Sequence, residues 1–536
     1  MANMLTRLRH ARSFCTIPTY EAGPRIYSCK VRNKIPLELP TSPALTTSYT
    51  CGPTVYDSAH IGHASCYVRV DILQRILKQH FRVNLVTAMN ITDIDDKIIR
   101  RASEQGKPWQ ELSRHYEQEF WSDLRRLNVQ TPDIILRVTD HIPAIVAFID
   151  KLLSTGYAYK STDDSIYFET SKHPQYGKLQ NIPSEEGPAV GKKSAADFAL
   201  WKASKPGEPF WESPFGPGRP GWHIECSTLA TQIFGSRLDF HAGGLDLRFP
   251  HHENEEAQSC CYHQVQDWVR YWIHTGQLHL EGQTHKMSKS LKNTVSIREL
   301  LDGYSADEFR MLCLLSHYRS VIEYGTDTMA IATNVLKKLR SFIKDSKAYV
   351  AGIKPATSID AVLLQTKLAE VDKKVDEFLC NDFNTANAVT SLADLASVVN
   401  KSINQRTSEL VSASESGAVQ GAMNYIRDKL ALFGLQSFVD DAKVTATDNQ
   451  SGQSVEHLIE ALVKLRSTVR RKAMETKDRT LFDICDQMRD ELKLLNVEVK
   501  DHGKLTSWSY VTRRKFLIFT NLATQLGHEL RNLFCC

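Results

Sequence analysis

The chain has 536 residues, of which 42% are hydrophobic and 24% are charged, and its formal net charge is +4. These values are ordinary for a globular protein with three or four domains of about 150 residues each. They exclude a polycation that binds nucleic acid through its overall charge, so any such partner must be held by local basic patches. No apolar run reaches about 18 residues without a charge, which argues against a membrane-spanning helix. The twelve scattered cysteines favour free thiols, a few of them bound to metal, over a disulfide scaffold.

The first twenty residues differ in composition from the rest of the chain. They contain Arg7, Arg9 and Arg12 together with serine and threonine, and no acidic residue occurs before Glu21. An arginine-rich, acid-poor segment that can form an amphipathic helix is typical of a mitochondrial transit peptide, although disordered basic tails share this composition. We therefore predict that residues 1–24 form a transit peptide or a disordered leader, and that the protein acts in the mitochondrial matrix.

From residue 45 to residue 300 the pattern alternates between strand-like and helix-like segments. Ser48–Cys51 has the pattern of the end of a strand, and a Gly-Pro turn follows it. Val68–Lys78 has helical apolar spacing, and Val83–Met89 has the pattern of a second buried strand. A strand, a helix and a strand at this spacing predict an α/β fold with a parallel sheet.

The stretch 106–219 interrupts this pattern and is predicted to be an insertion. Two helices are expected near Trp109–Leu127 and His141–Thr155, followed by a hairpin in Tyr157–Glu169. A segment rich in proline and glycine, Lys205–Pro220, comes next, and the α/β pattern resumes after it. The α/β domain is therefore expected to consist of two separate stretches of chain.

Beyond about Asp327 long helical patterns dominate, as in Met329–Ser346 and Ser391–Val411. The segment Thr445–Ser454 is polar and low in large apolar residues, which predicts a linker. The last segment, Val455–Lys515, is basic and rich in helical patterns. These features predict a helical domain followed by a smaller C-terminal domain.

The first chemical motif is His60-Ile61-Gly62-His63, which follows the predicted strand and turn and opens a predicted helix. A helix N-terminus offers N–H groups and the positive end of a dipole, which suits phosphate, and imidazoles can donate hydrogen bonds to phosphate oxygens. Taken alone, the motif is better explained as a helix cap with a surface histidine.

The second motif is Lys286-Met287-Ser288-Lys289-Ser290, in a polar loop. Two lysines in a loop can stabilise charge that develops on a transferring phosphoryl group, and taken alone they could equally form a solvated basic loop. The two motifs in this order, flanking an α/β domain, are the signature of class I aminoacyl-tRNA synthetases and related nucleotidylyl transferases.

A third group of residues contains metal-ligand types. Cys51 ends the first predicted strand, and Cys226 lies in a helix that begins after Gly221. His251 and Glu255 are four residues apart in a predicted helix, so they share one face. Two thiolates, an imidazole and a carboxylate can bind zinc in a tetrahedral site. The two cysteines are far apart in sequence, and by themselves they are more typical of buried apolar side chains.

Together these residues closely resemble those of cysteinyl-tRNA synthetases. The resemblance runs from about Ile26 to Trp508, which is nearly the whole chain. The segments that carry it are Cys51–Asp57, His60–His63, Asn90–Lys97, Phe198–Lys202, Gly218–Cys226, Phe249–Glu255 and Lys286–Ser290.

The resemblance implies a Rossmann-like parallel-sheet catalytic domain with an inserted connective domain, followed by a helical anticodon-binding bundle and a small C-terminal domain. The implied boundaries are 25–105 and 220–300 for the catalytic domain, 106–219 for the connective domain, 301–360 for stem-contact helices, 361–445 for the tRNA-binding bundle, 446–454 for a linker and 455–536 for a C-terminal anticodon-recognition domain.

The implied activity is an ATP-dependent ligation. L-cysteine is activated as cysteinyl-adenylate and is then transferred to the terminal adenosine of tRNA(Cys), with Mg²⁺ accompanying the ATP. One zinc ion per chain is expected to select cysteine through its thiolate, because a plain pocket separates near-isosteric substrates only ~10–200-fold. The expected partners are tRNA(Cys), cysteine and ATP, with no membrane, and the protein is expected to be a monomer.

The family's functional residues carry over onto matching positions of this chain. The implied zinc ligands are Cys51, Cys226, His251 and Glu255. The implied cysteine pocket consists of Cys51, Thr92, Trp222, His241 and Asp246. The implied catalytic residues, which also bind ATP, are His60, His63, Lys286 and Lys289, and Gly62 and Ser288 complete the ATP site.

Two positions depart from the family's pattern. Ala242 stands where the family usually has glycine, and its methyl group is expected to tighten the pocket without blocking it. Ser65 stands where the family usually has arginine, which removes one contact to ATP or within the fold.

The C-terminal third is expected to bind the RNA. Its basic stretch contains Arg466, Arg470, Arg471, Lys472, Lys477 and Arg479. Such residues bind phosphates, and a tryptophan such as Trp508 can stack on an unpaired base. The predicted tRNA contacts are Arg470, Arg471, Lys472 and Trp508. A solvated helix face and a core tryptophan are the alternative interpretations of these residues.

Three other functions are compatible with parts of the sequence. A ligase that joins cysteine to an amino sugar would share the adenylation site and the zinc, but it would not need the helical third beyond Asp327. A noncatalytic RNA-binding relative should lack part of the phosphate or zinc residues, and here all are present. The family resemblance also permits a second activity that makes cysteine persulfide with pyridoxal phosphate.

Overall fold

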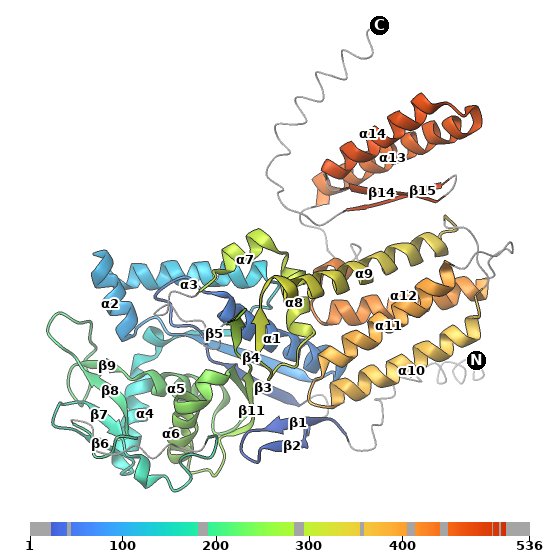
Figure 1. Cartoon of the computed structure of the whole chain (residues 1–536). Coiled ribbons are helices and arrows are strands. Elements are labelled where there is room, and N and C mark those ends of the chain that lie inside the picture. The colour runs from blue at the N-terminus through green and yellow to red at the C-terminus, as the bar shows by residue number, and fades with distance from the viewer. Residues whose placement is uncertain are drawn as a thin grey trace, which may run out of the picture.

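The computed structural model describes residues 23–39, 44–180, 191–282, 294–353, 359–404, 413–439, 449–495, 497–502 and 505–510. Its centre is a five-stranded sheet in the order β11-β10-β3-β4-β5, in which every pair is parallel. The strands are β3 (Leu45–Thr50), β4 (Asn84–Ile91), β5 (Ile134–Arg137), β10 (Leu238–Gly244) and β11 (Val269–Thr275). The predicted α/β fold with a parallel sheet is confirmed (Figure 1).

Helices connect these strands and cover the sheet. Helix α1 (Ile61–Arg75), which continues as a short π-helical segment to His80, joins β3 to β4, and α6 (Glu253–His263) joins β10 to β11. Helices α2 (Asp96–Gln105) and α3 (Trp109–Arg126) join β4 to β5. Most residues of the sheet's long strands are buried, as expected for parallel strands covered on both faces.

The strand order reverses at the centre of the sheet. From β3 the chain moves outward to β4 and β5, whereas from β10 it moves outward to β11 in the other direction, and β3 and β10 are neighbours. Where the strand order reverses in this way, the connections diverge and leave a binding crevice at the carboxyl ends of the strands. Cys51 follows β3 directly at this edge, and β10 ends there at Gly244.

The predicted insertion contributes to two sheets. Strand β5 lies within 106–219 but pairs with β4 in the central sheet. The rest of the insertion forms helix α4 (Ile142–Ser154) and most of a separate antiparallel sheet of four strands. These strands are β6 (Ala158–Lys160), β7 (Ile166–Phe168), β8 (Phe198–Ala203) and β9 (Gly218–Pro220). Their apolar side chains share one core with α5 (Trp222–Phe234) and α6, so the insertion packs directly on the helices that carry the site.

The second half of the chain is largely helical. The helices are α7 (Ile297–Gly303), α8 (Ala306–Leu314), α9 (Thr326–Val350), α10 (Ala361–Cys380), α11 (Thr385–Ile403) and α12 (Ala413–Leu432). Their buried faces form one apolar cluster with α1, so the bundle and the central domain are packed together. Two short antiparallel strands, β1 (Arg25–Ser28) and β2 (Asn33–Pro36), and a parallel pair, β12 (Leu278–Leu280) with β13 (Ile322–Tyr324), complete this part.

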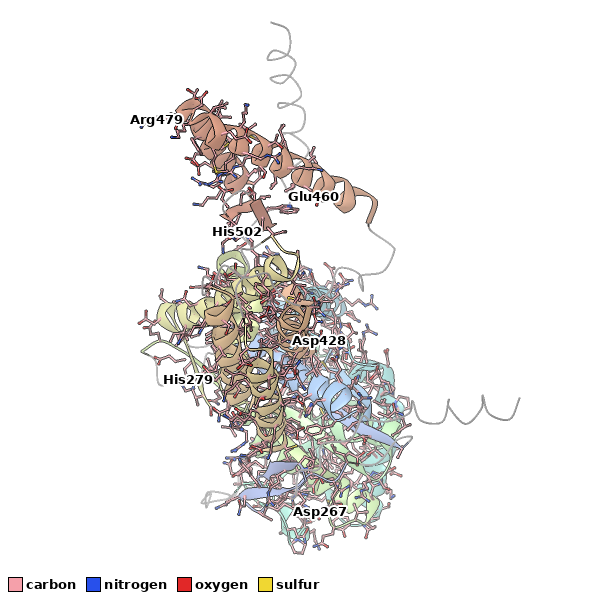
Figure 2. All side chains as sticks on the ribbon, turned by 90° about the vertical axis from the view of Figure 1, so that its right-hand side faces the viewer. Asp267, His279, Asp428, Glu460, Arg479 and His502 are labelled. Carbon is pink, nitrogen blue, oxygen red and sulfur yellow. The ribbon has the colours of Figure 1, made fainter. Side chains whose placement is uncertain are left out.

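A small C-terminal unit follows the bundle. It consists of α13 (Asn449–Thr476), α14 (Arg479–Leu494) and the antiparallel strands β14 (Val497–His502) and β15 (Leu505–Tyr510). Figure 2 shows this unit, with Glu460, Arg479 and His502, at one end of the molecule beyond the bundle. Because α13 already begins at Asn449, residues 449–454 of the predicted linker 446–454 are helical. Among the described residues, no helix is long and apolar enough to cross a membrane.

Candidate active site and metal centre

Four side chains with metal-binding atoms meet at this edge of the sheet. The Sγ atoms of Cys51 and Cys226 are 3.7 Å apart, and Cys51 Sγ lies 3.5 Å from Glu255 Oε1. His251 Nε2 lies 3.1 Å from the same oxygen, and the ligand atoms of all four residues lie within 4.8 Å of one another. The structure therefore brings together the four residues that the sequence predicts as ligands. Cys51 directly follows β3, Cys226 lies in α5, His251 lies in the short helical segment Arg248–His252, and Glu255 lies in the first turn of α6.

The geometry of this cluster suits a tetrahedral metal ion. The sulfur–sulfur distance of 3.7 Å is far beyond a disulfide bond of about 2.05 Å. It matches the separation of ~3.8 Å for two thiolates that each lie ~2.3 Å from one tetrahedral ion. All four side chains are buried, and burial raises the pKa of both thiols and lowers the pKa of His251. A cation at the centre would reverse this preference and stabilise the thiolates.

A second set of histidines surrounds the cluster. His241 Nε2 lies 2.8 Å from Glu255 Oε2, the other oxygen of that carboxylate. His252 Nε2 lies 3.5 Å from Cys51 Sγ, and its Nδ1 lies 2.9 Å from His274 Nε2. Cys51, His241, His252 and Glu255 themselves form an overlapping group that could hold a metal ion. The sequence reasoning missed His252 and His274, although the adjacent pair of histidines in the motif was a signal for the first of them.

Trp222 lies over one side of the metal cluster. This residue is 38% exposed, and its ring stacks on the His251 ring at a centroid distance of 4.2 Å. The neighbouring His223 places Nδ1 2.9 Å from His251 Nδ1, so it supports the ring of this predicted ligand. Burial lowers the pKa of His223 to about 3, which keeps its imidazole neutral. Trp222, as predicted for the cysteine pocket, is therefore in contact with a predicted metal ligand.

A cavity of about 530 Å³ opens beside Trp222 and His223. It lies between the antiparallel sheet and the segment that links β4 to α2. Its lining includes the basic side chains of Lys97, Lys192 and Lys202 and the aromatic rings of Tyr167 and Phe198. Lys202 forms an ion pair with Asp96 at 2.6 Å, whereas Lys97 and Lys192 contact tyrosine rings and no carboxylate within the described part of the chain.

The remaining predicted pocket residues lie along the same edge of the sheet. Thr92 follows β4 directly, and Asp246 lies in a helical turn, Leu245–Leu247, directly after β10. Side chains alternate along a strand, so His241 of β10 faces the metal cluster while Ala242 faces the apolar core that contains Phe240. The expectation that Ala242 tightens the pocket is therefore wrong, because its methyl group packs in the apolar core on the face of the sheet opposite to His241.

The histidine motif opens α1, as its sequence pattern predicts. His60 is the N-cap residue: its Nδ1 accepts a hydrogen bond from the Gly62 N–H at 3.1 Å, and the His60 N–H donates to His63 Nδ1 at 3.2 Å. The two rings stack at 3.9 Å. Because each Nδ1 accepts a hydrogen bond, each neutral ring carries its proton on Nε2, which makes this atom a donor. Two imidazole donors at a helix N-terminus suit a phosphate group. Ser65 is buried in the next turn of α1.

The lysine motif lies outside the described residues. Lys286, Ser288 and Lys289 fall in the range 283–293, between two described segments of the chain. The next described segment lies beside the histidine motif. The Ile61 N–H donates to the Val295 carbonyl at 2.9 Å, and Ser296 forms an isolated antiparallel β-bridge with His60. The segment that begins at residue 294, after the lysine motif in the chain, therefore contacts the histidine motif.

Comparisons with known proteins agree with this geometry. Residues 39–334 match the family model "tRNA synthetases class I (C) catalytic domain", and residues 374–437 match the DALR domain. The chain is 40% identical over 525 residues to the "Probable cysteine--tRNA ligase, mitochondrial" of Xenopus tropicalis, which covers 92% of this chain and 91% of the relative. It is 41% identical over 475 residues to the cysteine–tRNA ligase of Thermococcus onnurineus, with 87% and 94% of the two chains covered.

The chain belongs to the cysteine–tRNA ligase family. Among solved structures, the methionyl-tRNA synthetase of Mycobacterium tuberculosis in complex with methionyl-adenylate has a TM-score of 0.55 at 16% identity, and the match covers 73% of this chain and 90% of that one. At this identity the likeness shows the shared fold of the class I synthetases.

The residues predicted to bind RNA have different surroundings in this member of the cysteine–tRNA ligase family. Arg466 is buried and donates to both oxygens of Asp501 at 2.8 and 3.0 Å, and Arg470 lies 3.1 Å from the same carboxylate. Both arginines therefore hold the C-terminal unit together. Trp508 packs against the apolar core of this unit, which agrees with the alternative that it is a core residue. Arg471 and Lys472 are exposed on α13 and are accessible to a partner.

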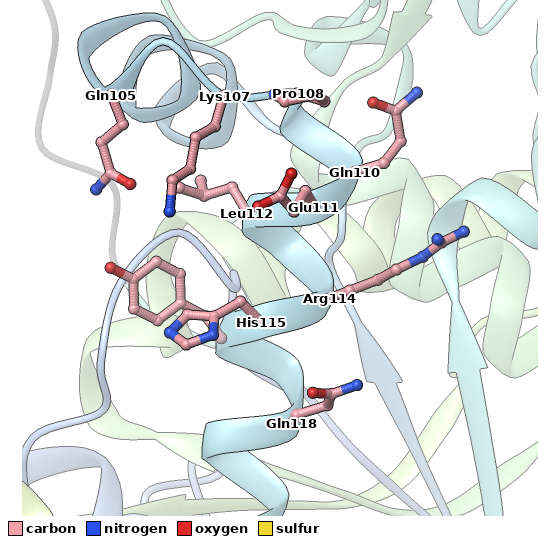
Figure 3. Close-up of a pocket in the computed structure, with 10 residues that line it drawn as sticks. Gln105, Lys107, Pro108, Gln110, Glu111, Leu112, Arg114, His115 and Gln118 are labelled. Atoms are coloured by element: carbon pink, nitrogen blue, oxygen red, sulfur yellow. The ribbon is translucent and has the colours of Figure 1, made fainter.

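A second cavity, of about 730 Å³, lies along the start of α3 (Figure 3). The side chains that line it include Lys107, Glu111, Arg114 and His115. None of the site residues predicted for this chain lines the cavity along α3. The mixture of acidic and basic groups in its lining does not indicate one class of ligand.

Proposed function

We propose that this protein is a cysteine–tRNA ligase that uses ATP to activate L-cysteine and transfers it to tRNA(Cys). The observation that carries the proposal is the cluster of Cys51, Cys226, His251 and Glu255 at the switch point of the sheet. It lies at the same edge as the histidine motif that opens α1. The family membership, together with the DALR match in the helical bundle, favours tRNA over an amino sugar as the acceptor.

In the first step, the carboxylate of cysteine attacks the α-phosphorus of ATP, and the bond to pyrophosphate breaks. The protein aligns the reactants and stabilises charge. His60 and His63 would donate hydrogen bonds from Nε2 to phosphate oxygens, and Lys286 and Lys289 would offset the charge on the leaving pyrophosphate, with Mg²⁺ accompanying the nucleotide. In the second step, a ribose hydroxyl of the terminal adenosine, which class I membership suggests is the 2′-hydroxyl, attacks the aminoacyl carbonyl, and AMP leaves.

The four clustered side chains would hold one zinc ion. Zinc supplies a Lewis acid that prefers a thiolate to the hard, poorly ionised hydroxyl of serine. Cys51 and Cys226 would provide sulfur ligands, and His241, which contacts the second carboxylate oxygen of Glu255, would orient this carboxylate. This arrangement would separate cysteine from serine without a second, hydrolytic site.

The cavity beside Trp222 suits the single-stranded 3′ end of the tRNA. Lysines attract phosphates, and aromatic rings stack on unpaired bases. Lys97 and Lys192, together with Tyr167, provide both kinds of group next to the predicted cysteine pocket. At the other end of the chain, Arg471 and Lys472 would contact phosphates of the RNA.

The proposal includes a location and an oligomeric state. The basic composition of residues 1–24 and the relative named as mitochondrial support the mitochondrial matrix. A fusion of these residues to a fluorescent protein tests the location. The proposed monomer is tested by light scattering of the purified protein.

Cysteine-dependent exchange of pyrophosphate into ATP tests the first step. We expect exchange with cysteine, no exchange with serine, and loss of exchange in Cys226→Ser. A matched control is Cys29→Ser, which removes a buried thiol outside the metal cluster and should keep the exchange. Robust exchange by protein freed of metal would contradict the zinc assignment. Charging of tRNA(Cys), run beside an amino sugar as acceptor, then decides between the two acceptors.

A further inference from the structure

The cavity of about 530 Å³ has two walls that belong to different parts of the fold. Lys97 lines it from the first turn of α2, and Tyr167 and Lys202 line it from the inserted antiparallel sheet. Helix α2 is anchored through Ile98 in one cluster of buried apolar side chains, whereas β8 of the sheet is anchored through Trp201 in another. The separation of the two walls therefore depends on contacts that cross from the sheet to α2.

One carboxylate makes such a contact with two neighbouring strands of the sheet. Asp96, the first residue of α2, places Oδ2 2.6 Å from Lys202 Nζ of β8 and Oδ1 2.5 Å from Arg219 Nη2 of β9. The other terminal nitrogen of Arg219 lies 2.6 Å from Glu208. Burial alone would raise the pKa of the Asp96 carboxyl, but the hydrogen bonds from Lys202 and Arg219 lower it to about 2, so this group is ionised at neutral pH.

The two cations depend on this carboxylate. Lys202 and Arg219 lie directly opposite each other in the antiparallel pair of β8 and β9. Like charges in directly opposite positions destabilise a strand pair. Asp96 offsets them with one oxygen for each cation, and Glu208 offsets the remaining charge. The link that joins the sheet to α2 therefore also stabilises the pairing of β8 with β9 beside the cavity.

Each wall presents a lysine beside a tyrosine ring. On α2, the Lys97 Nζ lies 5.5 Å from the centroid of the Tyr56 ring, and on the opposite wall the Lys192 Nζ lies 5.9 Å from the centroid of the Tyr167 ring. Ammonium groups attract phosphates, and aromatic rings stack on unpaired bases. A shift of α2 relative to the sheet would change the separation of these two pairs. Such a shift matters for transfer, because a misplacement of ~1 Å between reacting groups can lower a rate about 10²-fold.

We infer that Asp96 is a positioning residue that ties the inserted sheet to α2 and thereby aligns the terminal adenosine of the tRNA for attack on the aminoacyl carbonyl. This inference rests on the proposed function. Lys202 and Arg219 are the partners of Asp96 on the sheet. These three residues are distinct from the predicted metal ligands and from the histidine motif, so the link serves the second step and the first step should proceed without it.

The test measures the two steps separately. Cysteinyl-adenylate is first formed on the purified protein, tRNA(Cys) is then added, and the rate constant of transfer at saturating tRNA is measured by rapid quench. Asp96→Asn keeps the shape of the side chain without its charge. We expect the transfer rate constant to fall about tenfold or more, because the wall that bears β8 and β9 is no longer fixed to α2. Cysteine-dependent pyrophosphate exchange and KM for tRNA(Cys) should change less than about twofold, because the residues of the first step and most RNA contacts lie elsewhere.

A second variant distinguishes alignment from a simple effect of charge. Asp96→Asn makes this part of the cavity more positive, whereas Lys202→Met makes it less positive. A role through charge alone would change the affinity for tRNA in opposite directions in the two variants. A link needs both of its ends, so we expect both variants to lower the transfer rate constant. Asp164→Asn is the matched control, because it removes an ion pair with Lys160 from the same sheet outside the lining of this cavity, and it should leave transfer unchanged.

Three results would overturn the inference. One is an unchanged transfer rate constant in Asp96→Asn, and another is a change of tRNA affinity in opposite directions in the two variants. The third is an equal loss of exchange and transfer, which would mean that Asp96 only maintains the catalytic domain. Circular dichroism is measured for every variant, and if Asp96→Asn is unfolded, Lys202→Met decides by the same criteria. None of these results affects the proposed function, which fails only if the wild type shows no cysteine-dependent exchange and no charging of tRNA(Cys).

Discussion

Replacing Arg310 by methionine is expected to lower the free energy of unfolding by about 3 kcal/mol. Arg310 is buried at the junction of α8, α1 and the end of the bundle. Its guanidinium forms an ion pair with Asp71 of α1 at 2.5 Å. It also donates to three backbone carbonyls, at 3.1 Å for Leu127, 2.7 Å for Asn128 and 3.3 Å for Phe433.

The magnitude follows from what the variant leaves behind. Removing one partner of a buried ion pair typically costs about 3–5 kcal/mol, because the other charge is left uncompensated. Here Asp71 keeps the Arg75 Nε donor at 2.8 Å and the Gln130 N–H at 2.9 Å. The carboxylate therefore keeps a charged partner, and the loss should fall at the lower end of that range.

Urea unfolding of the wild type and Arg310→Met, followed by circular dichroism, measures this effect. Arg340→Met is the matched control, because this arginine is a quarter exposed and lies 3.3 Å from Asp307, so its loss should cost at most about 1 kcal/mol. If Arg310→Met destabilised the protein no more than the control, the argument that this buried pair joins α1 to the bundle would be refuted.

Three further outcomes are expected. In Gly52→Ala the new Cβ would lie 1.6 Å from the Asn90 carbonyl oxygen, so the loop after β3 must shift. Bound zinc, measured by atomic absorption, and cysteine-dependent pyrophosphate exchange should both fall at least tenfold. Burial lowers the pKa of His263 from 6.5 to about 4, so the unfolded state binds more protons than the folded state between these pH values. The contribution of His263 to stability should therefore be complete above pH 6.5 and decline as the pH falls towards 4. Unfolding midpoints measured from pH 7 to 4.5 should fall less steeply in His263→Gln than in the wild type, and an unchanged slope would contradict the reasoning. Arg466→Met leaves Asp501 without its bidentate partner and should unfold the C-terminal unit. Charging of tRNA(Cys) should then drop at least tenfold while pyrophosphate exchange persists. A parallel loss of exchange would show that the C-terminal unit also supports the catalytic domain.

Local patterns in the sequence were sufficient for much of the fold. The expected strand-turn-helix around Cys51 and His60, and the helix that begins after Gly221, are present. The spacing of His251 and Glu255 also placed both side chains together, as their 3.1 Å contact confirms. Such features depend on residues that are close in the chain, so backbone propensity and helical periodicity are enough to predict them.

The meeting of Cys51 and Cys226 had a different origin. No spacing rule links residues so far apart, and only the resemblance to a known family paired them. In the structure they meet because β3 and β10 are neighbours at the point where the strand order reverses, with α5 packed beside them. Strand order is a property of the whole sheet, so tertiary packing decided this contact.

Burial likewise separated side chains that look alike in the sequence. Arg466, Arg471 and Lys472 belong to one basic stretch, yet Arg466 lies in the core with Asp501 while the other two face outward. The alternation along β10 placed Ala242 in the apolar core and His241 at the metal cluster. The sequence by itself determined which residue types were available for the chemistry. The tertiary structure decided which of them share a site, because this depends on the face each side chain presents and on what packs against it.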